Sequence, residues 1–300
     1  MSSDSQTLIR LVMKLTLKLF LGFFLFAILF SACSQEEVFE VINEPKTIID
    51  AAYGNDEAQK ADIFLPEGRS QADTRVLLII HGGGWYTGDK KDMDKFVSTF
   101  QSKLKSYAVV NMNYRLVTFS PVRYMLPTQT DDIRLVMDYM AKNASDFGIK
   151  PEFVLLGLSA GGHLAMLYSY KYDKAGRVKA AVNIVGPCDL SDDAYKNNFI
   201  FNLGMNYITD PAHLPSGMSQ STFGSPVHWI TRNAPPTISF YGNTDKLIPL
   251  SQPSTLEQAL NQYNIPNEKY IYPGGHTEAS YDQSDDIVAK TVTFLTTHVR

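Results

Sequence analysis

Short apolar runs set the strongest constraint on what this chain can fold into. Five such runs recur along the sequence, and each is followed within two residues by glycine or asparagine. Runs of this length suit strands that are buried on both faces of a parallel sheet. They are residues Val76–Ile80, Ala108–Met112, Phe153–Leu156, Ala180–Val185 and Thr237–Tyr241.

Helical patterns lie between these runs. One begins after the acidic pair Asp131 and Asp132 and places apolar side chains on a single face as far as Met140. Similar patterns cover Leu256–Tyr263 and Ile287–Leu295. Strands that alternate with helices predict the α/β class, with a doubly wound and mostly parallel sheet. Ligands bind beyond the carboxyl ends of the strands in such sheets, so the residues after each run are candidates for function.

Composition narrows the possible partners. The chain has 300 residues, of which 44% are apolar and 19% charged, so it can bury one sizeable core. Its formal net charge of −4 and its lack of like-charge runs argue against binding to nucleic acid. Neither of its two cysteines, Cys33 and Cys188, has Cys or His partners at metal-ligand spacing. We therefore expect no metal and no cofactor.

The N-terminal segment has the pattern of a signal peptide. Basic Arg10, Lys14 and Lys18 precede an uncharged apolar run, Leu19–Phe30, and small residues follow it. That run is short for a transmembrane helix, which needs about 20 apolar residues. We predict that residues 1–32 are a signal peptide, although a start at Met13 would serve equally well, and the sequence does not decide whether residues 1–12 are translated. Removing residues 1–32, which carry a net charge of +2, changes the formal charge from −4 to −6.

Cys33 follows this leader directly. The segment from Phe30 to Cys33 resembles the lipobox of bacterial lipoproteins, in which the cysteine is lipidated and becomes the first residue, although Phe30 replaces the usual leucine. Several acyl chains hold a protein on a bilayer far more firmly than one chain does. The resemblance implies an exported protein that is lipid-anchored to a bacterial membrane; the alternative is a secreted soluble protein. Residues 33–44 would form the lipidated cysteine and a tether.

A serine lies between a predicted strand and a predicted helix. Gly157 and Gly161 flank Ser159 in a G-x-S-x-G pattern directly after Phe153–Leu156. A serine on so sharp a turn requires a strained backbone, and side chains at the flanking positions would collide with the neighbouring elements. The helix that follows would also favour negative charge developing on a substrate oxygen. The pattern predicts a nucleophilic Ser159.

A glycine-rich loop follows the run that ends at Ile80. Its sequence, His81-Gly82-Gly83-Gly84-Trp85, matches loops whose backbone N–H groups bind the oxyanion of a tetrahedral intermediate. We expect Gly83, Gly84 and Ala160 to donate these hydrogen bonds. A phosphate loop or a plain turn is the alternative, but neither G-x-x-x-x-G-K-[ST] nor G-x-G-x-x-G is present. We expect His81 itself to be structural.

Taken together, these motifs resemble the α/β-hydrolase family, in particular its hormone-sensitive-lipase-like and bacterial feruloyl- and acetyl-esterase-like branches. The resemblance covers nearly all of residues 45–300, which we expect to form one catalytic domain. It implies that Asp245 is the acid and His276 the base of a triad with Ser159, in the chain order that this fold uses. Asp189 also follows a predicted strand and is the alternative acid.

The connection from Ser191 to Pro235 interrupts the regular alternation. Connections of this length are usually functional lids or disordered segments. One interpretation is a cap over the active site at about residues 191–235, and the other is a small packed insertion. Its aromatic residues, such as Phe199, Phe223 and Trp229, would then either stack on a sugar or feruloyl ring or simply pack the insertion.

The sequence therefore predicts a serine carboxylesterase that hydrolyses short-chain or carbohydrate-linked esters of the acetyl or feruloyl type through a Ser-His-Asp triad. Its expected partner is a small-molecule or oligosaccharide ester. Two alternatives remain: an amidase or peptidase of the same fold, formamidase-like or prolyl-peptidase-like, and a non-catalytic binding protein on a hydrolase scaffold. Fold alone cannot choose the substrate.

Overall fold

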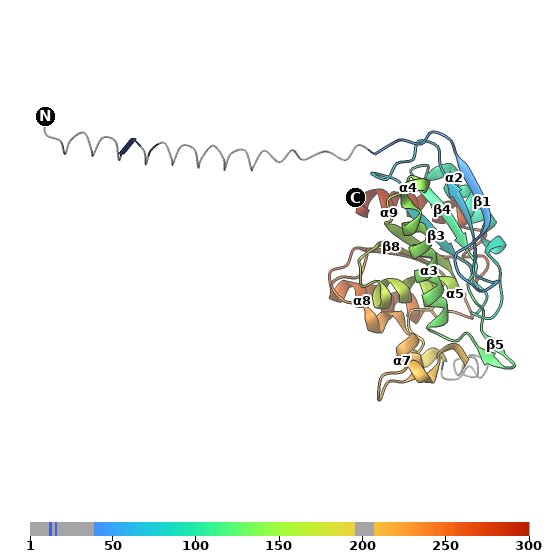
Figure 1. Ribbon diagram of the computed structural model, residues 1–300. Helices are drawn as coiled ribbons and strands as arrows, with labels where there is room; N and C mark the ends of the chain where they lie inside the picture. Colours follow the sequence, from blue (N-terminus) through green and yellow to red (C-terminus); the bar gives the residue numbers. More distant parts are fainter. Residues whose placement is uncertain (1–11, 14–15, 17–38, 196–206, 300) are drawn as a thin grey trace, which may run out of the picture. The chain divides into compact units, whose positions relative to one another are not determined.

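The computed structural model describes residues 12, 13, 16, 39–195 and 207–299. The elements below lie in one compact unit, Glu40–Arg300. Its described residues form an eight-stranded sheet (Figure 1). In spatial order the strands are β1 (Lys46–Ala52), β2 (Lys60–Leu65), β4 (Tyr107–Met112), β3 (Arg75–Ile80), β7 (Phe153–Leu158), β8 (Val178–Ile184), β9 (Thr237–Gly242) and β10 (Asn267–Tyr272).

The sheet is mostly parallel, as predicted. Every pair from β4 to β10 runs parallel, whereas β2 pairs antiparallel with both β1 and β4. Each of the five apolar runs forms a strand. A two-stranded hairpin, β5 (Thr118–Phe119) and β6 (Val122–Arg123), stands apart from the main sheet. The α/β class with a mostly parallel sheet is confirmed.

Helices occupy the connections between the strands. They are α2 (Asp94–Lys103), α3 (Thr128–Lys142), α4 (Ala144–Phe147), α5 (Ala160–Leu167), α7 (Gln220–Gly224), α8 (Ser251–Gln262) and α9 (Ser284–His298). Shorter turns are η1 (Lys90–Met93), η2 (Tyr168–Tyr172), η3 (Asp193–Tyr195), η4 (Pro211–His213) and η5 (Pro226–Trp229). The three helical patterns of the sequence correspond to α3, α8 and α9.

Strand β3 shows how the sheet is covered on both faces. Val76, Leu78 and Ile80 pack in the cluster that contains α3 and α5. Leu77 and Ile79 point the opposite way, into the cluster that contains α2 and α9. Successive side chains of a strand alternate between faces, so a continuous apolar run requires helices on both sides. The carboxyl ends of the parallel strands are thereby held at one edge of a rigid layer.

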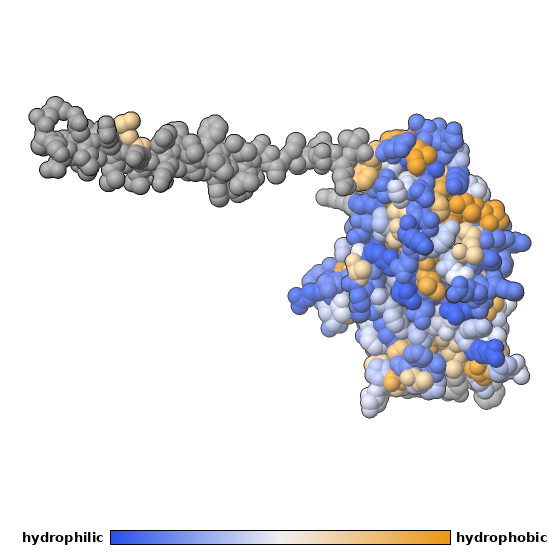
Figure 2. All heavy atoms as spheres, viewed as in Figure 1, coloured by the Kyte–Doolittle hydropathy of each residue, from blue (hydrophilic) through white to orange (hydrophobic). Residues whose placement is uncertain are grey.

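The surface is polar in comparison. In Figure 2 the visible face of this unit is mostly hydrophilic, with hydrophobic residues in small separate groups. Large apolar side chains that remain exposed include Tyr86, Phe119 and Leu247. Within the described residues, no helix combines the length and the apolar character needed to cross a bilayer.

Candidate active site

Ser159 occupies the sharp turn between β7 and α5. Its backbone has φ 53° and ψ −118°, which is a strained conformation for a residue with a side chain. The flanking glycines make this turn possible. A Cβ atom on Gly157 would lie 2.1 Å from the carbonyl carbon of Gly161, and one on Gly161 would lie 2.1 Å from the carbonyl oxygen of Ile80. The sequence therefore needs glycine at both positions to place Ser159 at the sheet edge.

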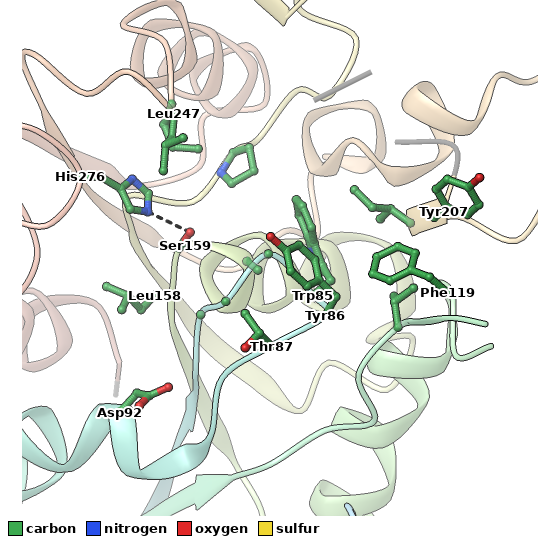
Figure 3. A pocket seen from close by; sticks show the side chains of 18 of the residues that line it. Trp85, Tyr86, Thr87, Asp92, Phe119, Leu158, Ser159, Tyr207, Leu247 and His276 are labelled. Atoms are coloured by element: carbon green, nitrogen blue, oxygen red, sulfur yellow. Dashed lines mark hydrogen bonds between the residues drawn. The ribbon is translucent and has the colours of Figure 1, made fainter. Parts of the chain in front are cut away.

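The structure brings Ser159, His276 and Asp245 together in a chain of hydrogen bonds. The Oγ atom of Ser159 lies 2.9 Å from Nε2 of His276 (Figure 3). On the other side of the imidazole, Nδ1 lies 2.7 Å from Oδ2 of Asp245. Asp245 follows β9 and His276 follows β10, so the ends of three parallel strands supply the three side chains.

The carboxylate of Asp245 is held in its ionised form. Its side chain is only 1% exposed. Burial raises its pKa, but the hydrogen bond with His276 and the backbone N–H groups of Ile248 and Leu247 outweigh burial, so the net pKa is lowered. A buried carboxylate that stays ionised stabilises a positive charge on the neighbouring imidazole.

Asp189, the alternative acid, lies elsewhere. Its Oδ1 accepts hydrogen bonds from the backbone N–H and the hydroxyl of Ser191, and from the hydroxyl of Ser225. The histidine nearest to it is His228, 3.9 Å away. The hydrogen-bond partner of His276 is Asp245.

Gly83, Gly84 and Ala160 line the same cavity as Ser159. Within the described chain, the N–H groups of these three residues donate no hydrogen bond. Gly83 has φ +103°, and a Cβ there would lie 2.1 Å from the carbonyl oxygen of Thr87, so the turn excludes side chains. Unpaired N–H groups beside a serine can bind an anionic oxygen.

His81 is structural, as expected. It is buried and stacks on Tyr114, with ring centroids 4.3 Å apart, and its Nδ1 donates to the carbonyl of Gly82 over 2.7 Å. The hydroxyl of Tyr114 donates to the carbonyls of His81 and Gly82. The Asn113-Tyr114-Arg115 segment after β4 thus supports the start of the glycine loop. Burial also lowers the pKa of His81.

His163 has a role that the sequence did not reveal. This residue lies in α5, one turn after Ser159, and is fully buried. Its Nδ1 accepts from the indole N–H of Trp85 over 3.1 Å, and its Nε2 donates to the carbonyl of Gly224 over 2.6 Å. Burial lowers its pKa to about 4, so it is neutral at pH 7. His163 therefore joins the helix behind Ser159 to the glycine loop and to α7.

A cavity of about 580 Å³ opens over Ser159. The side chains that surround it are largely apolar or aromatic (Figure 3). Its described lining consists of Gly82, Gly83, Gly84, Trp85, Tyr86, Thr87, Asp92, Val117, Phe119, Leu158, Ser159, Ala160, Pro187, Tyr207, Ile208, Leu247, Ile248, His276 and Tyr281. The volume suits a small organic substrate.

The described part of the long connection contributes two residues to this cavity. Tyr207 and Ile208 line the cavity, whereas Phe223 and Trp229 do not. Phe223 is buried, its ring meets that of Trp229 edge to face, and the ammonium of Lys171 lies over both rings. For these two residues the stacking hypothesis is wrong, because they pack on each other outside the cavity lining, Phe223 buried and Trp229 partly buried.

Some expected features fall outside this geometry. Cys33, Phe199 and the leader lie outside the described residues. Cys188 is a buried free thiol whose pKa is raised by burial, and its Sγ donates to the carbonyl of Gln252. Among the described residues, no three His, Cys, Asp or Glu side chains are grouped so that they could hold a metal ion.

Comparison with known proteins agrees with this architecture. The chain is 24% identical over 238 residues to the esterase LipC of Mycobacterium tuberculosis, which covers 75% of this chain and 58% of LipC. It is 28% identical over 228 residues to the probable carboxylic ester hydrolase LipM of the same organism, covering 71% of this chain and 51% of LipM. The chain thus spans a little over half the length of these curated relatives.

A solved structure and a protein family complete the comparison. A truncated carbohydrate esterase from gut microbiota superposes with a TM-score of 0.66 at 19% identity, covering 87% of this chain and 98% of that one, which shows a shared fold. The BD-FAE family matches residues 61–260, two thirds of the chain. The chain therefore belongs to the BD-FAE family, a family of α/β hydrolases.

Proposed function

We propose that this protein is a serine carboxylesterase. The observation that carries the proposal is the hydrogen-bonded chain of Ser159, His276 and Asp245, which ends in a cavity lined by the unpaired N–H groups of Gly83 and Ala160. Enzymatic hydrolysis of an ester needs a nucleophile, a base and an oxyanion site, all within reach of the same carbonyl group. The names of the relatives, esterase and carboxylic ester hydrolase, support the same reaction.

The geometry accounts for each step of ester hydrolysis. His276 removes the proton of Ser159 while Oγ attacks the acyl carbon, and the carbonyl oxygen becomes an anion that Gly83, Gly84 and Ala160 stabilise. Asp245 holds the imidazole in the correct tautomer and stabilises its cation. His276 then gives its proton to the alcohol oxygen, which leaves. Water attacks the acyl-enzyme in the same way and releases the acid.

We propose short-chain or carbohydrate-linked esters as the substrates. A cavity of about 580 Å³ has room for a small acyl group and one or a few sugar rings, and its aromatic lining suits rings. The shared fold with a carbohydrate esterase makes sugar esters natural compounds to test.

The test is a substrate screen with the full chain. It compares p-nitrophenyl esters, acetylated xylan, feruloyl esters, formyl amides and peptides, with Ser159→Ala as the blank. We expect turnover of the esters only. Faster turnover of formyl amides or peptides, or a wild type as inactive as the blank, contradicts the proposal.

We further propose that Cys33 anchors the protein to a bacterial membrane after export. The support is the small-residue site at the end of the apolar run, directly before Cys33. Palmitate labelling in a bacterial host should tag the wild type, and Cys33→Ser should remove the tag and release the protein from membranes. An untagged wild type that is cleaved elsewhere contradicts the anchor.

A further inference from the structure

One end of the active-site cavity carries a carboxylate that the triad does not use. Asp92 is the one acidic side chain among the described residues that line the cavity. In Figure 3, His276 lies above Ser159 and Asp92 lies below it, beyond Leu158; both are on the left of the view, whereas Tyr86, Phe119 and Tyr207 are on the right. The cavity thus has an acidic end at Asp92 and an aromatic end on the other side of the view.

Hydrogen bonds hold Asp92 in place. It closes a capping box at η1: its Oδ2 accepts from the backbone N–H of Asp89, and the carboxylate of Asp89 accepts from that turn. Asn113 donates to Asp89, and the buried ammonium of Lys90 forms ion pairs with Asp62 and with the exposed Asp50. A carboxylate on so well anchored a turn is pre-organised for a ligand.

The Oδ1 atom of Asp92 accepts no hydrogen bond from the described residues. A phenol lines the same cavity: the backbone carbonyl of Tyr281 accepts a hydrogen bond from Lys95, three residues after Asp92. Tyr281 packs on Phe96 of α2, next to η1, and the hydroxyl of Thr87 lines the cavity as well. A substrate hydroxyl needs an acceptor and a donor, and this end of the cavity offers both.

The chemistry of the triad decides which part of the ester meets this end. His276 must give a proton to the leaving alcohol oxygen, so the alcohol part lies on the His276 side of Ser159. The loop that starts at His276 continues to Tyr281, which lines the cavity and contacts Lys95 and Phe96 of α2, the helix that follows Asp92. The acyl part then extends toward the aromatic end. This step rests on the esterase function proposed above.

We propose that Asp92 determines specificity by accepting a hydrogen bond from a hydroxyl group of the alcohol part, so that uncharged, hydroxyl-bearing alcohols such as sugars and polyols are preferred. A carboxylate acceptor binds a hydroxyl more strongly than a neutral oxygen does. The same charge repels anionic alcohol groups.

The test compares two acetate esters that share the acyl group and differ in hydroxyls, a monoacetylated methyl xyloside and cyclohexyl acetate. Wild-type full chain and Asp92→Asn are assayed with both. The amide oxygen of the asparagine can still accept the hydrogen bond from the backbone N–H of Asp89, so η1 keeps its capping box. We expect the ratio of kcat/KM for the sugar ester over the cyclohexyl ester to fall about tenfold in the variant, mainly through KM.

The matched control is Asp94→Asn, which removes the same charge from an exposed position two residues away, outside the cavity. It should leave the ratio unchanged. A ratio that does not change in Asp92→Asn overturns the proposal while the wild type still hydrolyses esters. A second comparison uses choline acetate and its neutral analogue 3,3-dimethylbutyl acetate. The proposal is also overturned if the wild type prefers choline acetate over this analogue by a larger factor than it prefers the sugar ester over cyclohexyl acetate. Asp92 would then recognise cations. Failure of the esterase function itself would appear as no hydrolysis of any ester.

Discussion

The indole N–H of Trp85 donates a hydrogen bond to Nδ1 of His163 over 3.1 Å, and this bond joins the glycine loop to the helix that follows Ser159. Trp85 has φ +69° and directly follows Gly84, while His163 lies in the first turns of α5. The bond ties the end of the glycine loop to α5, the helix that begins at Ala160. A neutral imidazole is required, because Nδ1 must accept.

The neutrality of His163 predicts a pH dependence of stability. Its pKa is about 4 in the folded protein, against about 6.5 in the unfolded chain. Between these values the unfolded chain binds more protons, so the free energy of unfolding falls as the pH is lowered from about 6.5 to about 4. The contribution of His163 is about 3 kcal/mol over this window. Denaturant titrations at several pH values measure it.

A variant isolates this contribution, because His81 is also buried with a lowered pKa and adds to the wild-type slope. His163→Gln keeps a donor and an acceptor but cannot titrate in this range. Its stability should depend less steeply on pH between 4 and 6.5 than that of the wild type. Equal slopes for the two proteins would show that His163 is not the titrating group.

Replacing the nucleophile should abolish activity without unfolding the protein. Ser159→Ala removes the attacking Oγ while alanine keeps the Cβ that already fits the turn. We expect a loss of about 10⁶-fold in kcat and no covalent labelling by a fluorophosphonate probe. Circular dichroism serves as the control for folding. Labelling of the variant at another serine would refute the assignment.

The acid of the triad can be tested against its alternative. Asp245→Asn replaces a carboxylate 2.7 Å from His276 with an amide that favours the wrong tautomer, so kcat should fall about 10⁴-fold. Asp189→Asn is the matched change on a carboxylate that holds Ser191 and Ser225 instead. We expect it to change kcat only a few-fold. A larger loss in Asp189→Asn than in Asp245→Asn would reverse the two roles.

Local patterns in the sequence predicted the parts of the site that lie within single segments. Gly157 and Gly161 around Ser159, and the glycines after His81, are required by close backbone contacts, so their pattern is visible in one short stretch. The positions after β9 and β10 followed from strand order and family resemblance. This is why the strands, and the segments that the structure brings together around Ser159, could be predicted from the sequence.

The remaining features depend on segments that are far apart in the chain. Nothing around His163 indicates that it bonds Trp85, 78 residues away. The sequence also did not show that Phe223 and Trp229 lie outside the cavity lining and that Phe119 lies in it. Phe223 and Phe119 are both phenylalanines that the sequence alone does not distinguish, but packing buries Phe223 and leaves Phe119 51% exposed. Tertiary packing decides whether an aromatic side chain is buried or faces the cavity, and local sequence periodicity does not reveal this.

The aromatic end of the cavity should limit the length of the acyl group. Phe119 lies on the β5–β6 hairpin and meets Tyr86 and Tyr207 edge to face, with ring centroids 5.7 Å and 5.6 Å away. If the acyl part extends toward these rings, Phe119 blocks a long chain. Truncation to alanine opens this end, and the half-exposed position keeps the cost in stability small.

We therefore expect Phe119→Ala to raise the ratio of kcat/KM for lauryl over butyryl esters about tenfold, because two newly buried methylenes contribute about 0.8 kcal/mol each. The matched control is Val122→Ala, which truncates the cross-strand neighbour of Phe119 outside the cavity lining and should leave the ratio unchanged. Steady-state kinetics on an acyl series from acetyl to lauryl measures both variants. Equal losses for short and long esters would show that the acyl group lies at the Asp92 end instead, since Phe119 would then contact only the alcohol part.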